Sequence, residues 1–300
     1  MKTSYDYPGA LSLICGLISA YGMNILEGQI DTIEEAQPKR AALRSIRKRR
    51  RSATVSSRRK IFDIFLVRQV DESTSPDWQQ YEQELLRLVN LLRQREMNAT
   101  HGILAARLAS ALPELEQTDM RQLPVYIEID NSASDDFSVL RIDGHDTFRF
   151  LYELTNALAF NGLNITRMHI SSVGNRIHDT LYVTDLSKRK LLPPEKQQQV
   201  RAVVALVKHF TQVLPHTPNP EAAMLHFREF ITQFFSLPDW LSELSSLERP
   251  EVFDALINLL GISDFLWSDF LRMQHDYLFP VVQDVHGLSQ ARTVEMLESD

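Results

Sequence analysis

The sequence is poor in glycine and cysteine, and each scarcity excludes a class of site. Ten of the 300 residues are glycine, and none lies in a Gly-x-Gly-x-x-Gly or Gly-Lys-Ser/Thr loop, the motifs that cradle nucleotide phosphates. The single cysteine, Cys15, can form neither an intrachain disulfide nor a thiolate-rich metal site. We therefore expect a protein of a reducing compartment, the cytoplasm.

Motifs of hydrolases and metalloenzymes are missing as well. The sequence has no Gly-x-Ser-x-Gly nucleophile elbow and no His-Glu-x-x-His zinc motif. Three His-Asp pairs begin at His145, His178 and His275, on an expected loop, strand and helix end. Because a metal site needs ligands that converge, we interpret these pairs as polar turn and surface groups. We assign no catalytic residue, metal ligand or cofactor.

The one long uncharged stretch, residues 8–26, has 19 residues, close to the length of a membrane span. It is interrupted by Gly9, Gly16, Gly22 and Asn24, and its apolar positions recur on one helical face. That pattern is typical of a helix packed on a sheet, so we expect neither a membrane span nor a signal peptide. With 44% hydrophobic and 24% charged residues, the chain is long enough for two or three soluble domains.

Positive charge is concentrated in one segment. Residues 39–60 hold 11 of the 32 basic residues and no acidic one, although the whole chain has a formal net charge of −7. Such a run can neutralise nucleic-acid phosphates. It has no aromatic residue for base stacking and lies between two strand-like apolar runs, which favours a solvated insertion loop. Nucleic-acid binding through this segment, with the rest of the chain as its effector domain, is an alternative hypothesis.

An internal repeat appears when two segments of the chain are aligned without gaps. In each copy a helical period ends at a glycine and changes to strand-like alternation, which predicts a helix followed by a strand. The aligned pairs are Asp6 with Asp146, Gly22 with Gly162, Asn24 with Asn164, Ile25 with Ile165, and Ile30 with Ile170.

The same order of elements surrounds both copies. Around the second, strand alternation covers residues 137–143 and 177–184, and a helical period covers 195–213. Around the first, a strand over 60–70 follows the basic insertion, and a helix begins behind Pro76. The order β-α-β-β-α, used twice, predicts an α+β fold.

The last part of the chain has a different pattern. Three prolines within residues 215–220 mark a boundary, after which strand-like alternation ceases. The remainder is therefore expected to be an all-α segment. Helices are predicted over 225–235, 240–247 and 251–260, with a further helix beginning at Ser263.

The repeated units resemble ACT domains, which are small-molecule-sensing modules of amino-acid metabolism. The resemblance rests on the element order, on the turn Asp6-Tyr7-Pro8-Gly9-Ala10 into a helix, and on the Gly22-x-Asn24-Ile25 start of the next strand. It covers residues 1–214 and implies two ferredoxin-like βαββαβ ACT modules that pair with each other, followed by the all-α helical segment.

The second copy carries a more particular resemblance. The segments 125–134 and 181–185, together with the pair His145-Asp146, are similar to the C-terminal ACT pair of bacterial PII uridylyltransferases. Residues 222–285 resemble the opening helices of glutamine-synthetase adenylyltransferases, which precede a nucleotidyltransferase core. That core requires a Gly-Ser turn and an Asp-x-Asp to hold Mg²⁺, and this sequence has neither. We therefore expect the non-catalytic part of a longer or split nitrogen-regulation transferase.

The resemblance also implies a ligand site. In such ACT pairs a small ligand, often an amino acid, binds between the turn before the first helix of one module and an Asn-containing strand of its partner. Pro8 and Gly9 would let a backbone N–H approach a carboxylate where the helix dipole favours an anion, and an Asn amide both donates and accepts. The second copy has Phe148 and Arg149 instead, so we expect a bulkier, charged turn there. The implied ligand-binding residues are Asp6, Tyr7, Pro8, Gly9, Ala10, Asn24, His145, Asp146 and Asn164.

Two of these residues have an alternative interpretation. Asn24 can contact a ligand or have a structural role at the start of its strand, and for Asn164 the structural role is favoured. A third hypothesis for the whole chain is an ACT interaction scaffold that binds no ligand.

The sequence thus predicts a regulatory region that senses an amino acid, glutamine being the choice that the family implies. The bound effector would shift the orientation of the ACT pair, and the helical segment would pass this change to a transferase core or to glutamine synthetase. The expected domains are a first module over 1–98 with a basic insertion at 36–59, a helical linker over 99–122, a second module over 123–214, and a helical segment over 215–300.

Overall fold

The computed structural model describes residues 4–5, 9–34, 59–71, 76–94, 96–111, 124–147, 149–238, 240–247 and 249–262. Within these ranges the chain has an α+β fold with one antiparallel sheet and eight α-helices. Almost all of the expected basic insertion lies outside the described residues, as does the helix predicted from Ser263.

The elements agree closely with the predicted order. The strands are β1 (Ser4–Tyr5), β2 (Met23–Glu34), β3 (Arg59–Gln69), β4 (Tyr126–Asp130), β5 (Ser138–His145), β6 (Leu163–Val173) and β7 (Arg176–Asp185). The helices are α1 (Ala10–Ala20), α2 (Trp78–Arg93), α3 (Met97–Ser110), α4 (Phe150–Phe160), α5 (Pro194–Val213), α6 (Pro220–Phe234), α7 (Trp240–Leu247) and α8 (Pro250–Leu260).

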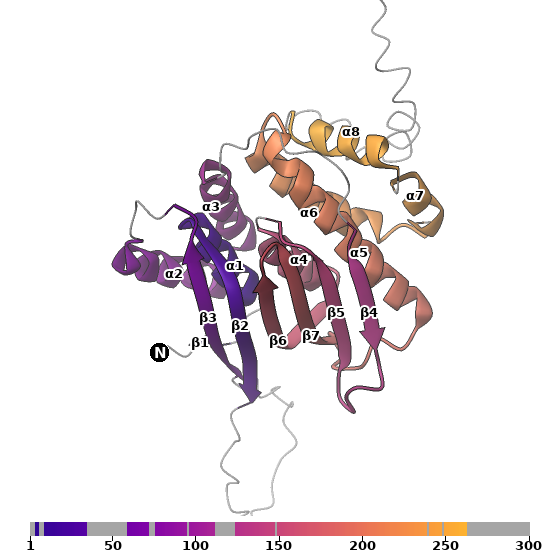
Figure 1. The fold of residues 1–300 in the computed structure, drawn as a ribbon, viewed down its shortest axis with the longest axis horizontal. Coiled ribbons are helices and arrows are strands. Elements are labelled where there is room, and N and C mark those ends of the chain that lie inside the picture. The colour runs from indigo at the N-terminus through magenta and orange to yellow at the C-terminus, as the bar shows by residue number, and fades with distance from the viewer. Residues whose placement is uncertain are drawn as a thin grey trace, which may run out of the picture.

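A single sheet contains the strands of both repeats, in the order β1-β3-β2-β6-β7-β5-β4. Its seam is the antiparallel pairing of β2 with β6, which runs from Glu27 opposite Ser171 to Asp31 opposite Arg167. At the far end of this seam Arg167 Nε also donates to Asp31 Oδ1 at 2.9 Å. Figure 1 shows the helices on one side of the sheet, with α6 and α8 outside α4 and α5. The two repeats are therefore joined strand to strand.

The internal repeat is reproduced in the backbone. Gly22 and Gly162, which follow α1 and α4, adopt φ values of 70° and 73°, a conformation that glycine tolerates without a steric cost. The following strands each have a bulge at the same place, after Ile25 in β2 and after Ile165 in β6. The helix-to-strand unit predicted twice from sequence is confirmed.

The end of each unit differs from the expected βαββαβ order. After α5 the chain passes through a short 3₁₀ turn (Leu214–His216) into α6, with no strand between them, and α2 is followed by α3. The prolines at 215, 218 and 220 explain the first difference, because proline cannot donate to a strand ladder. The sheet edge beside β5 is occupied instead by β4, which precedes β5 in the chain.

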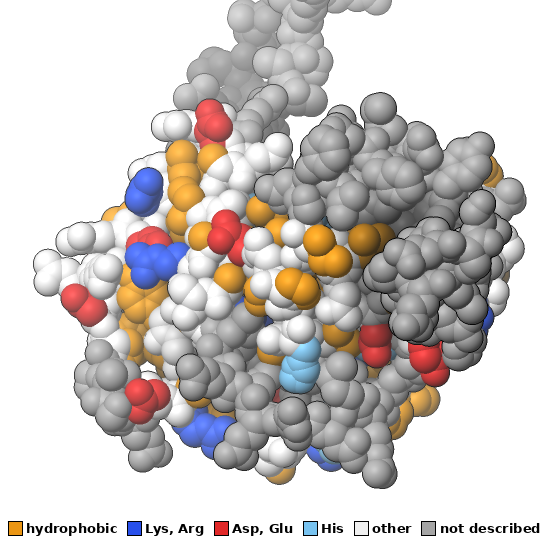
Figure 2. Space-filling view, turned by 90° about the horizontal axis from the view of Figure 1, so that it is seen from above, with side chains coloured by type: hydrophobic (Ala, Val, Ile, Leu, Met, Phe, Trp, Pro, Cys, Tyr) orange, Lys and Arg blue, Asp and Glu red, His pale blue; other side chains and the backbone are white. Residues whose placement is uncertain are grey.

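The C-terminal helices pack on the rest of the fold through aromatic rings. Phe210 of α5 stacks on Phe227 of α6 with ring centroids 3.9 Å apart, and Phe227 meets Phe253 of α8 edge to face. These rings belong to the same buried cluster as the helices that cover the sheet. On the face seen in Figure 2, hydrophobic side chains lie beside acidic and basic ones, so the described surface there has no single sign of charge. Among the described helices, none has the length and hydropathy to cross a membrane.

Two charged side chains are buried where α4 faces α3 and α6, and a third, partly buried one lies near them. Arg149, at the start of α4, and Glu153, one turn later, are each at most 4% exposed. Arg228 of α6 lies over the Phe160 ring at 5.1 Å and donates to Asn98 Oδ1 at 3.3 Å. Burial raises the pKa of Glu153 to about 8, although the charges of Arg149 and Arg228 lower it. This carboxyl is therefore costly to ionise in the folded state.

Gly16 allows α1 to approach its neighbours closely. A Cβ at this position would stand 2.6 Å from Tyr152 Cδ2 of α4 and 2.7 Å from Leu104 Cδ2 of α3. We expect Gly16→Ala to lower the free energy of unfolding by about 1–3 kcal/mol in a urea titration, since the clash outweighs the gain in helix propensity. Gly102→Ala in α3 is the matched control, because nothing lies within 4 Å of its added Cβ. It should raise stability by up to about 1 kcal/mol. Equal effects of the two changes would contradict the proposed close packing.

Glu153 should make stability depend on pH. Its folded pKa of about 8 is above the ordinary value of 4.5, so the folded state holds a proton that the unfolded state has lost between those pH values. The stabilisation is fully present below pH 4.5 and is lost as the pH rises through 8. We expect Glu153→Gln to match the wild type in thermal unfolding near pH 4.5 and to be more stable by roughly 1–3 kcal/mol near pH 8.5. Parallel pH profiles would show that Glu153 is not buried in this way.

Candidate functional site

Two residues predicted for ligand binding meet across the seam between the repeats. Asn24 begins β2 in the first repeat, and Asp146 lies in the turn before α4 in the second, 122 positions later. Asn24 Nδ2 donates to Asp146 Oδ2 at 3.2 Å, and Ser172 Oγ of β6 donates to the same oxygen at 3.5 Å. The predicted turn of one repeat therefore faces the predicted asparagine of the other.

A small cavity of about 30 Å³ lies at this contact. It has room for one or two water molecules, so a larger ligand can enter only if the walls of the cavity move apart. Its walls come from α1, β2, β6, β7 and the turn before α4. The lining residues are Ser19, Asn24, Ile25, Asp146, Thr147, Arg149, Phe150, Leu151, Ile170, Ser172, Ile177 and Asp179.

The turn before α4 is held from two sides. The Asp146 backbone N–H donates to the Asn175 carbonyl at 2.7 Å. From α5, Lys208 Nζ donates to the His145 carbonyl and, at 3.0 Å, to Thr147 Oγ1. Lys208 is itself buried and lies 4.7 Å from the centre of the Phe150 ring. These hydrogen bonds hold the turn in place at the N-terminus of α4, where the helix dipole is positive.

Arg149 adopts a conformation that is unusual for its residue type. It precedes α4 with φ 69°, whereas the equivalent residue of the first repeat is Gly9 with φ 84°. A positive φ costs a non-glycine residue roughly 1 kcal/mol or more, and such strain collects at functional sites. Phe148, the other residue of the expected bulkier and charged turn, lies outside the described residues. The Arg149 side chain is 4% exposed and lies inside the protein.

The interpretation of His178-Asp179 as a polar surface pair is wrong for Asp179, which is buried. His178 is half exposed and pairs with Asp143, whereas Asp179 on the opposite face of β7 is 3% exposed and lines the cavity. One of its carboxylate oxygens, Oδ1, has no hydrogen-bond partner. Burial raises the pKa of Asp179 to about 7, while the Ser171 backbone and the charge of Lys208 lower it. Strand alternation could have revealed this, because Asp179 shares its face with Ile177 and Leu181.

Both signs of charge therefore border the cavity. Asp146 and Asp179 provide carboxylates and Arg149 a cation, while the Lys208 charge lies behind the wall and interacts with both carboxylates. Burial lowers the pKa of Lys208 to about 8, against the opposite effect of the two carboxylates. Sequence reasoning missed Lys208, although it follows Val204 by four residues and so shares the buried face of α5. Such a site suits a small molecule that carries both charges.

The other predicted site residues are placed as follows. His145 contributes its carbonyl to Lys208, and Gly9 and Ala10 form the start of α1. Asn164 donates to Thr166 Oγ1 at 3.3 Å, a local contact within β6. Asp6, Tyr7 and Pro8 lie outside the described residues, so the counterpart of the Asn24–Asp146 contact in the other half of the repeat is not described. Across the described ranges, His, Cys, Asp and Glu side chains do not gather in threes as a metal ion requires.

Comparisons with known proteins give relatives but no family model and no solved structure. The relatives are named bifunctional uridylyltransferase/uridylyl-removing enzymes. The protein from Rhodospirillum rubrum is 28% identical over 211 residues, which cover 70% of this chain and 19% of the relative. The protein from Rhodopseudomonas palustris is 29% identical over 208 residues, and that from Bradyrhizobium diazoefficiens is 27% identical over 209, each covering 67% of this chain. Over about two thirds of its length this chain is homologous to bifunctional uridylyltransferase/uridylyl-removing enzymes, of whose own length it spans about one fifth.

Proposed function

We propose that this chain is the effector-sensing region of a nitrogen-metabolism nucleotidyltransferase, in which two ACT modules bind an amino acid at the Asn24–Asp146 contact. The observation that carries the proposal is this contact itself, made between the strand of one repeat and the turn of the other at 3.2 Å. It is the arrangement that the resemblance to ACT pairs implies. The homologous uridylyltransferases support the transferase context.

The charges around the cavity suit a zwitterionic amino acid. The ligand carboxylate would lie at the N-terminus of α4, near Arg149 and Lys208, where the helix dipole and both cations favour an anion. The ammonium group would lie between Asp146 and Asp179. The Asn24 amide can then donate to and accept from an amide side chain, which is the reason to propose glutamine.

Binding would act as a switch because the unliganded cavity is too small for an amino acid. The ligand would take the place of the Asn24–Asp146 hydrogen bond and so favour a more open arrangement of the two repeats. We propose that α6 receives this change through the buried Arg149 and Glu153 and the neighbouring Arg228 of α6, which is only partly buried. The helical segment, which we propose to be of the glutamine-synthetase adenylyltransferase type, would pass it to a transferase core or to glutamine synthetase.

The proposal predicts that glutamine stabilises the chain through Asn24. Isothermal titration should give saturable binding, and glutamine at about 100 times its Kd should add about 2.7 kcal/mol of stability in thermal unfolding. Asn24→Ala should weaken binding about tenfold, since one ligand hydrogen bond is lost. Asn164→Ala is the matched control, because Asn164 is the equivalent residue in the other repeat and makes only a local contact.

Other outcomes would reject the proposal or its details. If no protein amino acid stabilises the wild type, the amino-acid-sensing function is wrong. Equal losses in the Asn24→Ala and Asn164→Ala variants would place the ligand away from the Asn24–Asp146 contact.

A further inference from the structure

The outer edge of the sheet along β3 is open over most of its length. Among the described residues, β1 pairs with β3 at Lys60 and Ile61, and no strand continues this pairing from Phe62 to Gln69. Figure 1 shows β1 and β3 at one end of the sheet. A strand edge without a partner presents a row of backbone N–H and C=O groups that can pair with another chain.

The second repeat shows what the equivalent edge accepts. Ser4 and Gly144 each stand two residues before the aligned aspartates of the repeat, and they pair with Ile61 of β3 and Ile177 of β7. β7 therefore corresponds to β3. In the second repeat β5 covers this edge as an antiparallel strand, as far along β7 as Val183. The open edge of β3 thus has the geometry for an antiparallel strand.

The side chains along β3 are apolar on both faces of the sheet. Phe65 and Val67 pack against the core under the helices. Ile64 and Leu66 alternate with them on the open face, where they are 63% and 54% exposed. A strand that joins this edge needs apolar side chains on the same two faces, and β3 itself has them.

Helix α2 lies at the same end of the molecule and carries exposed apolar side chains. It is close to β3, because Tyr81 of α2 lies within range of the Asp63 charge. Trp78 and Leu86 of this helix are about half exposed. An antiparallel strand pairing about a twofold axis keeps the helices of both copies on the same side of the sheet, so α2 would lie nearest the α2 of the other copy.

We propose that a second copy of this chain pairs its β3 with this edge, antiparallel and about a twofold axis near Leu66, so that the two sheets become continuous. One pairing then satisfies both open edges, since each β3 is at once the template and the added strand. No like charges meet between residues 62 and 70, because Asp63 would face Gln69 and Arg68 would face Ile64.

Sedimentation velocity of the full chain between about 1 and about 100 μM, without any amino acid present, measures this pairing. We expect a reversible dimer with a Kd of about 10 μM, because a contact of two strands and two helices is at the small end of stable interfaces. Ile64→Lys and Leu66→Lys bring like charges together at the axis and should weaken the dimer about tenfold or more. Both side chains are exposed, so both variants should fold, which circular dichroism checks.

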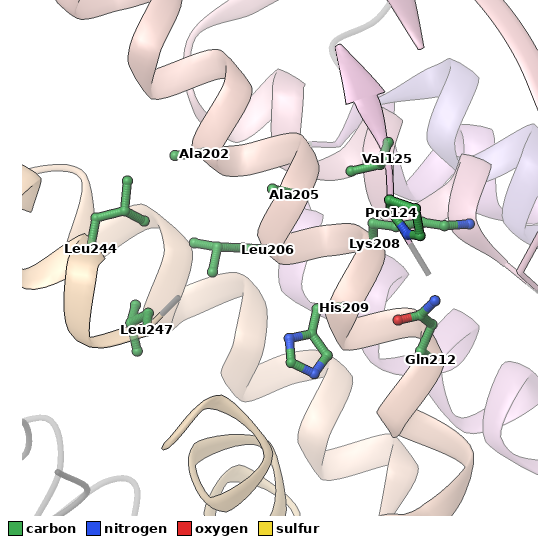
Figure 3. Close-up of a pocket in the computed structure, with 10 residues that line it drawn as sticks. All are labelled: Pro124, Val125, Ala202, Ala205, Leu206, Lys208, His209, Gln212, Leu244 and Leu247. Carbon is green, nitrogen blue, oxygen red and sulfur yellow. The ribbon is translucent and has the colours of Figure 1, made fainter. Parts of the chain in front are cut away.

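A different apolar surface supplies the matched controls. A cavity of about 310 Å³ lies between α5 and α7, where Leu206 faces Leu244 and Leu247 across the space (Figure 3). Ala205 lines this cavity and is exposed, so Ala205→Lys places the same charge there. Val173→Lys places it at the exposed end of β6. Neither change should alter the Kd of the dimer.

Leu66→Cys gives a second readout. Residues directly opposite each other in an antiparallel pair have Cβ atoms about 4.5–5.5 Å apart, close to the span of a disulfide. Mild oxidation should therefore link two copies of Leu66→Cys, and link Val173→Cys much more slowly. The native Cys15 is buried and does not compete.

Three results would overturn the proposal: a chain that stays monomeric over the whole concentration range, a folded Leu66→Lys variant that dimerises as well as the wild type, or a dimer of Leu66→Cys that oxidation does not link. A dimer lost only in Ala205→Lys would place the contact at the α5–α7 cavity and would also reject it. The pairing does not rest on the proposed function, and none of these results bears on the glutamine titration.

Discussion

The antiparallel pairing of β2 with β6 is the interaction on which the rest of the structure depends. It makes one sheet from two repeats, places α1 beside α4, and brings the beginning of β2 to the turn before α4. Neither repeat contains both partners of the candidate site's central contact, because Asn24 and Asp146 belong to different copies. The backbone ladder fixes the relative position of the two halves, since a register shift of one residue would move every side chain of the strand to the wrong face.

Buried charge is the second constraint on the structure. The charged groups lie near the turn before α4 and along the first turns of that helix. Asp179 and Lys208 lie beneath the turn, Arg149 forms its end, and Glu153 follows one helical turn later, close to Arg228 of α6. The four buried groups, Arg149, Glu153, Asp179 and Lys208, each cost free energy to bury and are tolerated because others of opposite sign are near. The C-terminal helices therefore interact with the second repeat through the charges near α4 as well as through the Phe210–Phe227 stack.

Much of this fold could be predicted from the sequence because its signals are local. Apolar periodicity located α5 and α8, and the two glycines after α1 and α4 marked the helix ends. The place of β4 in the sheet could not be predicted in that way. Which neighbour a strand pairs with depends on the whole fold, and the local sequence pattern does not show it. At the candidate site, the repeat singled out Asn24 and Asp146, which the structure brings into contact, whereas Lys208 could be found only from the position of α5. The alternation of β7 indicates that Asp179 is buried, but Asp179 was interpreted together with its neighbour His178 as part of a polar surface pair.

Gly9 and Arg149 occupy equivalent positions with nearly the same backbone conformation, and this has a consequence for stoichiometry. Two identical chains paired by the same seam would have two identical turns and hence two equal sites. Within a single chain each turn can diverge, and here one keeps the glycine while the other carries a buried guanidinium. The two halves are therefore inequivalent, and the Asn24–Asp146 contact lies at the start of α4, the helix of the second repeat against which α6 packs.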